Sequence, residues 1–280
     1  MIGLYTACND RMLPFLPGWL GAKRQFNDAA PAHVIAFDDN VAELKTFCAE
    51  RSVSLLCDAA QEWRRIGMRI YGSANYRRDV LRADYFSKLA AFTGPLPHFV
   101  FSDVNSLVLF DINRRFGDMQ LDGCRFMHKA RRFRTVSSRD ALRLYRELNP
   151  SFGSGYNANF FLSERNFITV AEANEALRRD DCSAENFGRA PEQSLLSWLE
   201  VALHKRCGLI RDIFPDLYPA KRRDLLAIRD GHVFDWRGRN VHFVKWNGAR
   251  FGPDIRHWNV ALHFRNLFER EHGAAAVVAR

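Results

Sequence analysis

The sequence predicts an α/β protein in which short strands form a sheet flanked by helices. Three apolar runs, Ile2 to Thr6, His33 to Phe37 and Phe99 to Phe101, each stop at polar residues, as buried strands do. Longer stretches with helical periodicity lie between and after these runs, and the chain has no internal repeat. Alternation of short strands with helices is typical of α/β folds.

The order of the predicted elements places one carboxylate at the end of a strand. The first run is followed by Asn9 and Asp10, and the second by Asp38-Asp39. A helical pattern covers residues 59–92, with a break near Gly72, and leads into the third run. Asp103 comes just after that run. Ligands of open α/β sheets commonly bind outside the carboxyl ends of the strands, so this position favours contact with a ligand.

Composition narrows the class of protein and of partner. The 280 residues, 47% of them hydrophobic, are enough to bury a large core. The six cysteines lie far apart without a C-x-x-C pair, which favours a reducing compartment. The start, MIGLYTACND, has no basic leader, and no apolar stretch approaches the roughly 20 residues of a membrane span. We therefore expect a cytoplasmic protein, whose net charge of +9 favours phosphate-rich partners.

A polar break interrupts the apolar stretch HFVFSDVNSLVLFDI, residues 98–112. It contains Asp103 and Asn105, whose side chains point to the same side of an extended segment. Magnesium and manganese prefer such oxygen ligands, so the pair predicts a metal site. The alternative interpretation is a turn in which both side chains bond to nearby backbone groups.

The longer stretch YFSKLAAFTGPLPHFVFSDVNSLVLFDI resembles the donor site of retaining glycosyltransferases of family 8, the group that includes glycogenin. In that family a helix with a basic residue precedes a strand and a D-x-D motif, which binds manganese and the diphosphate of a nucleotide sugar. Lys88 stands in the basic position and Asp103 in the first acidic one, whereas Asn105 replaces the second aspartate. The resemblance implies a GT-A-like nucleotide-diphospho-sugar transferase fold, with a mixed central sheet flanked by helices.

Two further segments follow the order of that family. YTACNDRMLPFLPGWLGAKR resembles the first strand and helix, which contact the nucleotide, and implies contacts from Thr6 and Asn9. GYNANFFLSERN resembles a strand that usually reads Asn-x-Gly near the sugar, with Asn157 matching and Asn159 in place of glycine.

The last two segments supply the remaining predicted site residues. PEQSLLSWLEVAL resembles a helix start with an Asp-Gln pair, represented here by Glu192 and Gln193. NVHFVKWNGARF resembles a closing segment in which a histidine binds the metal and a lysine meets phosphate. His242 matches the histidine, and the phosphate role falls to Lys245 or Arg250.

The resemblance implies transfer of a hexose, with retention, from a uridine diphosphate sugar to a glycan, a lipid-linked glycan or a protein. Asp103, Asn105 and His242 are the implied ligands of Mn²⁺ or Mg²⁺, with weak binding unless the donor supplies further oxygens. An inverting enzyme would instead need a placed carboxylate base, a role for which Glu192 and Asp122 are candidates.

The predicted catalytic domain covers residues 1–250, and residues 251–280 form a C-terminal helical extension packed on it. The segment WNVALHFRNLFEREHG places its apolar residues on one helical face, while its polar side mixes both charge signs. The mixed signs favour packing on the protein over binding to a membrane, although peripheral membrane contact remains an alternative.

Other interpretations remain open. The chain could be a basic, non-enzymatic protein that binds nucleic acid or another polyanion through Arg131, Arg132, Arg134 and residues 221–223. The absence of a nucleic-acid-binding motif disfavours that hypothesis. An inactive protein with a GT-A fold is a third possibility. Taken alone, Lys88 could be a solvated helix residue and His242 a hydrogen-bonded strand residue.

Overall fold

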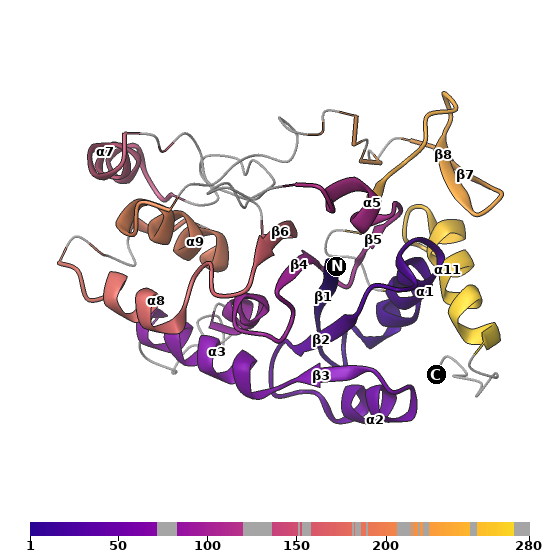
Figure 1. The fold of residues 1–280 in the computed structure, drawn as a ribbon, viewed down its shortest axis with the longest axis horizontal. Helices are drawn as coiled ribbons and strands as arrows, with labels where there is room; N and C mark the ends of the chain where they lie inside the picture. Colours follow the sequence, from indigo (N-terminus) through magenta and orange to yellow (C-terminus); the bar gives the residue numbers. More distant parts are fainter. Residues whose placement is uncertain are drawn as a thin grey trace.

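The computed structural model describes residues 1–71, 83–119, 136–150, 152, 158–180, 182, 186–188, 190–205, 214, 216–217, 219–220, 224–246 and 251–271. Its centre is a five-stranded sheet in the order β3-β2-β1-β4-β6 (Figure 1). The first four of these neighbours run parallel, and β6 runs antiparallel to β4. The predicted mixed sheet is therefore confirmed. The strands are β1 (Gly3–Cys8), β2 (Ala32–Ala36), β3 (Ser54–Leu56), β4 (His98–Ser102) and β6 (Phe160–Glu164).

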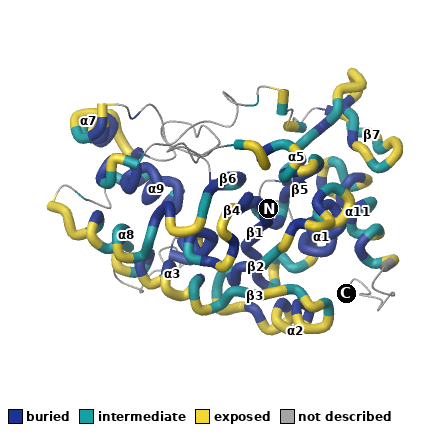
Figure 2. The backbone as a smooth tube through the Cα atoms, in the orientation of Figure 1, coloured by how far each residue is buried: buried dark blue, intermediate teal, exposed yellow. Residues whose placement is uncertain are grey.

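The two central strands are continuous apolar runs because both faces of the sheet are covered. All six residues of β1 are buried, and Phe99, Val100 and Phe101 of β4 have no exposed surface. Such strands cannot alternate polar and apolar residues when helices pack on both sides. Phe161 of β6 stacks on Phe101 with ring centroids 4.8 Å apart, which extends the core across the antiparallel edge. Figure 2 shows these strands buried at the centre of the molecule.

Helices cover the sheet, and the predicted helical segment before β4 is confirmed in two pieces. α3 ends at Tyr71, and the chain is described again from residue 83, where it soon enters the 3-10 helix η2. α7, α8 and α9 lie together away from α1 and α11 (Figure 1). The helices are η1 (Leu13–Phe15), α1 (Leu16–Asn27), α2 (Ala42–Glu50), α3 (Asp58–Tyr71), η2 (Tyr85–Phe92), α5 (Ile112–Phe116), α7 (Arg139–Leu148), α8 (Val170–Ala176), α9 (Pro191–Ala202) and α11 (Trp258–Glu271).

In the part of the chain that the structure describes, two small sheets lie outside the central one. β5 pairs antiparallel with β9, and Ser106 faces Lys245 in that register. β7 and β8 form a hairpin through Asp230 and Gly231, which both have positive φ angles, as a tight two-residue turn requires. The strands are β5 (Ser106–Val108), β7 (Leu226–Arg229), β8 (His232–Asp235) and β9 (Phe243–Lys245).

The C-terminal helix α11 packs against α1, and the two axes approach closely (Figure 1). A Cβ atom placed on Gly21 of α1 would lie 1.9 Å from the carbonyl oxygen of Phe264, so only glycine fits there. Val260, Ala261, Phe264 and Phe268 of α11 are buried. Among the described residues, no helix is both long and apolar enough to cross a membrane. The division of the chain at residue 250 stays a prediction.

Candidate functional site

The polar break after β4 is a tight, anchored turn. Asp103 is the residue directly after the strand, and its N–H donates to the carbonyl oxygen of Asn159 at 2.9 Å. The N–H of Ser106 donates to the carbonyl oxygen of Asp103 at 2.9 Å. The indole of Trp19 donates to the hydroxyl of Ser102 at 2.8 Å, in a fully buried contact between α1 and the end of β4. The backbone of Asp103 is therefore fixed at the carboxyl end of the central sheet.

Two lysines hold the carboxylate of Asp103, one on each oxygen. Lys88 Nζ, from η2, lies 2.7 Å from Oδ1, and Lys245 Nζ, from β9, lies 2.6 Å from Oδ2. The side chain of Lys88 is only 7% exposed, that of Lys245 15% and that of Asp103 13%. Ion pairs this buried are stable only with good geometry, because each charge has lost its hydration. Two ammonium groups and one carboxylate leave the cluster with an excess positive charge.

The pKa shifts of the cluster follow from burial and from these pairings. Burial raises the pKa of a carboxyl, but Lys245 and Lys88 outweigh it and hold the pKa of Asp103 below its ordinary value. Burial lowers the pKa of a lysine, yet Asp103 and Glu192 outweigh it at Lys88, whose pKa is raised. At Lys245 burial prevails over Asp103, and its pKa is lowered. The carboxylate and Lys88 are thus stabilised in their charged forms.

Glu192 and Gln193 occupy the first turn of α9, which starts with Pro191, a residue favoured at this position. Every residue of α9 is buried, and the helix packs against η2, which carries Lys88. Glu192 Oε2 and Gln193 Oε1 have no hydrogen-bond partner among the described residues. Burial raises the pKa of Glu192, with Lys88 opposing the shift in part. Two buried oxygens in the first turn of α9 can therefore accept hydrogen bonds from a ligand.

Thr6 and Asn9 lie at the carboxyl end of β1, next to β4 in the sheet. Thr6 is fully buried, and its hydroxyl has no partner in the described part of the chain. The amide of Asn9 donates to Asp38 Oδ2 at 2.7 Å and accepts from the N–H of Met12 at 3.0 Å. The side chain of Asn9 thus links the ends of β1 and β2, and its predicted nucleotide contact stays a prediction.

Asn105 and Trp246 extend the pairing of β5 with β9. The side-chain Nδ2 of Asn105 donates to the carbonyl oxygen of Trp246 at 2.6 Å. The N–H of Trp246 donates to the carbonyl oxygen of Asn105 at 2.9 Å. Asn105 therefore fastens the residue that directly follows Lys245.

His242 is not brought to Asp103. Its carbonyl oxygen accepts from the N–H of Leu109, and its ring packs edge-on against Phe110, with centroids 6.1 Å apart. Side chains alternate along an extended segment, so His242 and Lys245, three positions apart, face opposite sides. Burial lowers the pKa of His242, Arg115 lowers it further, and Asp216 opposes both. Arg115 and Asp216 are thus among its charged neighbours.

The residues that the structure describes do not fit a divalent metal at this site. They include no group of three or more His, Cys, Asp or Glu side chains placed to hold one. Both oxygens of Asp103 are engaged by ammonium groups, and Asn105 directs its N–H₂ group to a backbone carbonyl. Magnesium and manganese require several oxygen ligands at short distance. The structure thus does not assemble the three predicted metal ligands.

Several solved structures similar to this chain are glycosyltransferases. Galactosyltransferase LgtC, in complex with donor and acceptor sugar analogues, matches with a TM-score of 0.56 and 13% identity over 96% of each chain. The chain has the GT-A glycosyltransferase fold. An active-site glutamine-to-glutamate mutant of LgtC matches with a TM-score of 0.55 and 13% identity over 95% of each chain. Mouse xyloside xylosyltransferase 1 matches with a TM-score of 0.51 and 10% identity over 89% of this chain and 98% of that one.

No protein-family model matches the chain, and no curated protein sequence matches it. The predicted GT-A fold is thus confirmed by structure, while membership of family 8 stays a prediction.

A second charged group in this GT-A fold was not predicted from the sequence. Arg64 of α3 bonds to Asp39, after β2, at 2.6 Å and to Asp84, before η2, at 2.8 Å. The only signal in the sequence was the pair Asp38-Asp39 at the end of a predicted strand. Asn9 joins this group through Asp38. The network ties the ends of β1 and β2 to η2, and so fixes the helix that carries Lys88.

Several predicted residues lie outside the described part of the chain. They are Asp122, Asn157, Arg250, the basic residues Arg131, Arg132 and Arg134, and residues 221–223.

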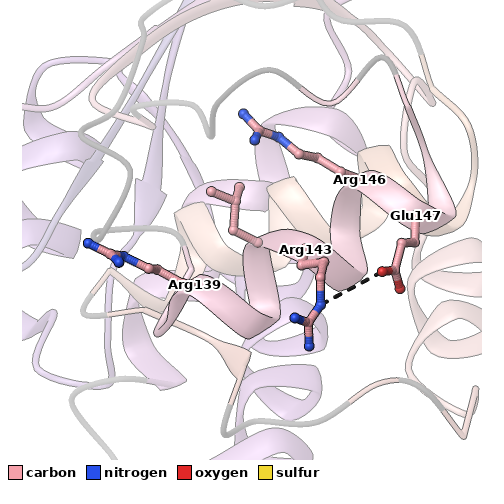
Figure 3. A pocket seen from close by; sticks show the side chains of 5 residues that line it. Arg139, Arg143, Arg146 and Glu147 are labelled. Atoms are coloured by element: carbon pink, nitrogen blue, oxygen red, sulfur yellow. Dashed lines mark ion pairs between the residues drawn. The ribbon is translucent and has the colours of Figure 1, made fainter.

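A pocket of about 380 Å³ lies beside α7 (Figure 3). None of the residues that line it belongs to the Asp103 cluster. Arg143 pairs there with Glu147 at 3.8 Å, and both side chains are well exposed. Arg139 and Arg146 extend from the same helix (Figure 3). Exposed pairs of this kind contribute little to stability, and none of the predicted site residues lines the pocket.

Proposed function

We propose that the protein is a glycosyltransferase that moves a hexose from a uridine diphosphate sugar to a hydroxyl of a glycan, a lipid-linked glycan or a protein. The observation that carries the proposal is the cluster of Lys88, Asp103 and Lys245 at the carboxyl end of β4 in a GT-A fold. The complex of LgtC with donor and acceptor sugar analogues supports the kind of substrate.

The cluster is suited to a diphosphate. Each lysine ammonium has three N–H donors, and Asp103 accepts a hydrogen bond from each lysine. The remaining donors can meet phosphate oxygens, and charge-assisted hydrogen bonds of this kind are the stronger ones. Because Asp103 holds both ammonium groups in place, little side-chain freedom is lost when a phosphate binds.

The same charges act on the chemical step. The bond between the anomeric carbon and the diphosphate oxygen breaks, and its electron pair stays on that oxygen. The acceptor oxygen forms the new glycosidic bond on the same face of the sugar, and its proton passes to the departing diphosphate. Lys88 and Lys245 stabilise the negative charge where it develops, which is the main source of catalysis in such reactions.

Glu192 and Gln193 position the sugar in this proposal. Their unpartnered oxygens, buried beside the helix that carries Lys88, can accept hydrogen bonds from sugar hydroxyls. The LgtC structure with a mutated active-site glutamine supports a role for Gln193. Asn157 joins them on the basis of the family resemblance.

A calorimetric screen of UDP, GDP and their hexose conjugates, followed by an assay for released UDP, tests the proposal. We expect UDP and a UDP-hexose to bind, and UDP release to rise when an acceptor is added. Binding without release on any acceptor would favour an inactive GT-A-fold protein. Absence of nucleotide binding would contradict the proposed function.

A further inference from the structure

We infer that Lys88 and Lys245 supply the positive charge that binds the donor diphosphate, at the position where the sequence predicts a metal ion. Asn105 holds Lys245 in place for this role. Donor binding then needs no divalent metal. This inference rests on the proposed function and goes beyond it.

The first support is the occupation of Asp103. A metal bound to this carboxylate would have to displace an ammonium group that lies 2.6 or 2.7 Å from each oxygen. It would also lie beside two buried cations, which repel it strongly in a region of low polarity. Asp103 and the two lysines together carry one positive charge in excess, and Glu192, which also acts on both lysines, offsets that charge only when it is ionised.

The second support is the use made of Asn105. Its amide donates to the carbonyl oxygen of Trp246 at 2.6 Å, and the N–H of Trp246 donates back to its carbonyl oxygen. Ser106, the next residue, faces Lys245 in the register of β5 and β9. Asn105 thereby fixes the backbone of Trp246, the residue after Lys245. This fixes the position from which the Lys245 side chain reaches Asp103. An aspartate could not donate this hydrogen bond.

These two observations explain one another. Asn105 stands in place of the second acidic residue, so one charged metal ligand is missing. The same side chain positions Lys245, whose positive charge takes the place of the charge of a metal ion. His242 faces the other side of the strand, near Arg115 and Asp216, where it takes no part in the cluster. Asn105 is therefore a positioning residue for Lys245.

The test is titration of UDP into the full chain by calorimetry, once in EDTA and once in manganese chloride. We expect binding in EDTA, with a dissociation constant within about threefold of the value in manganese. Lys245→Met should weaken binding in EDTA roughly 10-fold or more, as loss of a charge-assisted hydrogen bond does, and manganese should not restore it. Lys45→Met, at an exposed position of α2, is the matched control and should leave the affinity unchanged.

Asn105→Asp separates positioning from general damage to the fold. It should weaken UDP binding in EDTA several-fold, and manganese should restore the affinity because a second carboxylate now stands beside Asp103. A merely structural role would not make binding respond to manganese.

Two results would overturn the inference in different ways. If the parent chain binds UDP in manganese and not in EDTA, the donor site depends on a metal, and the proposed function stands without this inference. If UDP, GDP and ADP all fail to bind under both conditions, the proposed function itself is wrong. Loss of folding in Lys245→Met, visible by circular dichroism, leaves the comparison of EDTA with manganese in the parent chain as the deciding result.

Discussion

Lys245 Nζ lies 2.6 Å from Asp103 Oδ2, although the two residues are 142 positions apart in the sequence. The contact exists because β9 pairs with β5, the strand that follows Asp103. The other oxygen of the same carboxylate holds Lys88 from η2. Three separate segments thus meet at one carboxylate, and the proposed donor site forms only when the whole sheet region is folded.

Lys88→Ala should weaken UDP binding by roughly 1.5–3 kcal/mol, because one charge-assisted contact to the diphosphate is lost. Titration calorimetry measures the effect, and the melting temperature shows whether the variant is folded. Lys45→Ala, at an exposed position of α2, is the matched control and should leave the affinity unchanged. Equal UDP affinity in Lys88→Ala and the parent would remove Lys88 from the donor site.

Asp103→Asn should lower the free energy of unfolding by roughly 3–5 kcal/mol, because two buried ammonium groups lose their shared partner. Urea unfolding measures the change. Asp140→Asn is the control, since its pair with Arg143 at 3.3 Å is exposed and should contribute at most about 1 kcal/mol. A similar small loss in both variants would show that the Asp103 pairs do not stabilise the fold.

Glu192→Gln should change the pH dependence of stability. Burial raises the pKa of Glu192 above its ordinary 4.5, so the native state binds this proton more tightly than the unfolded state does. Its contribution to stability is complete below that ordinary value and is lost as pH rises through the raised one. Glutamine cannot ionise, so the variant should gain free energy of unfolding relative to the parent as pH rises towards neutral.

Urea unfolding of the two proteins at several pH values measures this gain. Glu43→Gln, at an exposed position of α2, is the control and should run parallel to the parent. A Glu192→Gln curve that also runs parallel would show that Glu192 is ionised with no cost in the native state.

Gly21→Ala should destabilise the protein by roughly 1–3 kcal/mol, because the new methyl group overlaps the backbone of Phe264 and forces α11 away from α1. Gly18→Ala on the same helix is the matched control. A Cβ there would lie 3.5 Å from the nearest atom, so the higher helix propensity of alanine should leave stability equal or increased. Thermal unfolding compares the two, and an equal response would place α11 further from α1.

The sequence predicted those parts of the fold that short segments determine. The runs ending at Asn9, Asp38 and Asp103 are strands because their apolar residues are contiguous, and this also placed Asp103 correctly at a strand end. The antiparallel direction of β6 could be inferred only from the family resemblance, since strand direction depends on contacts between distant segments.

The pairing of side chains within the candidate site depends on contacts between distant segments, which could not be predicted from the sequence. The partners of Asp103 depend on the register between β5 and β9, which puts Lys245 opposite Ser106 and leaves His242 opposite Leu109. A shift of one residue would turn each side chain to the other face. The sequence therefore placed Lys88 and Asp103 in one site but predicted metal ligation where the structure has ion pairs.

The most direct test of the proposed donor site is the melting temperature of the protein with a millimolar UDP-hexose, compared with that in the presence of a DNA duplex. A ligand that binds only the native state must stabilise it. We predict that the UDP-hexose raises the melting temperature of the parent chain and raises that of the Lys88→Ala variant by less. The duplex should leave the melting temperature unchanged. No shift with the UDP-hexose, together with tight and strongly salt-dependent binding of the duplex, would contradict the donor site and favour a polyanion-binding protein.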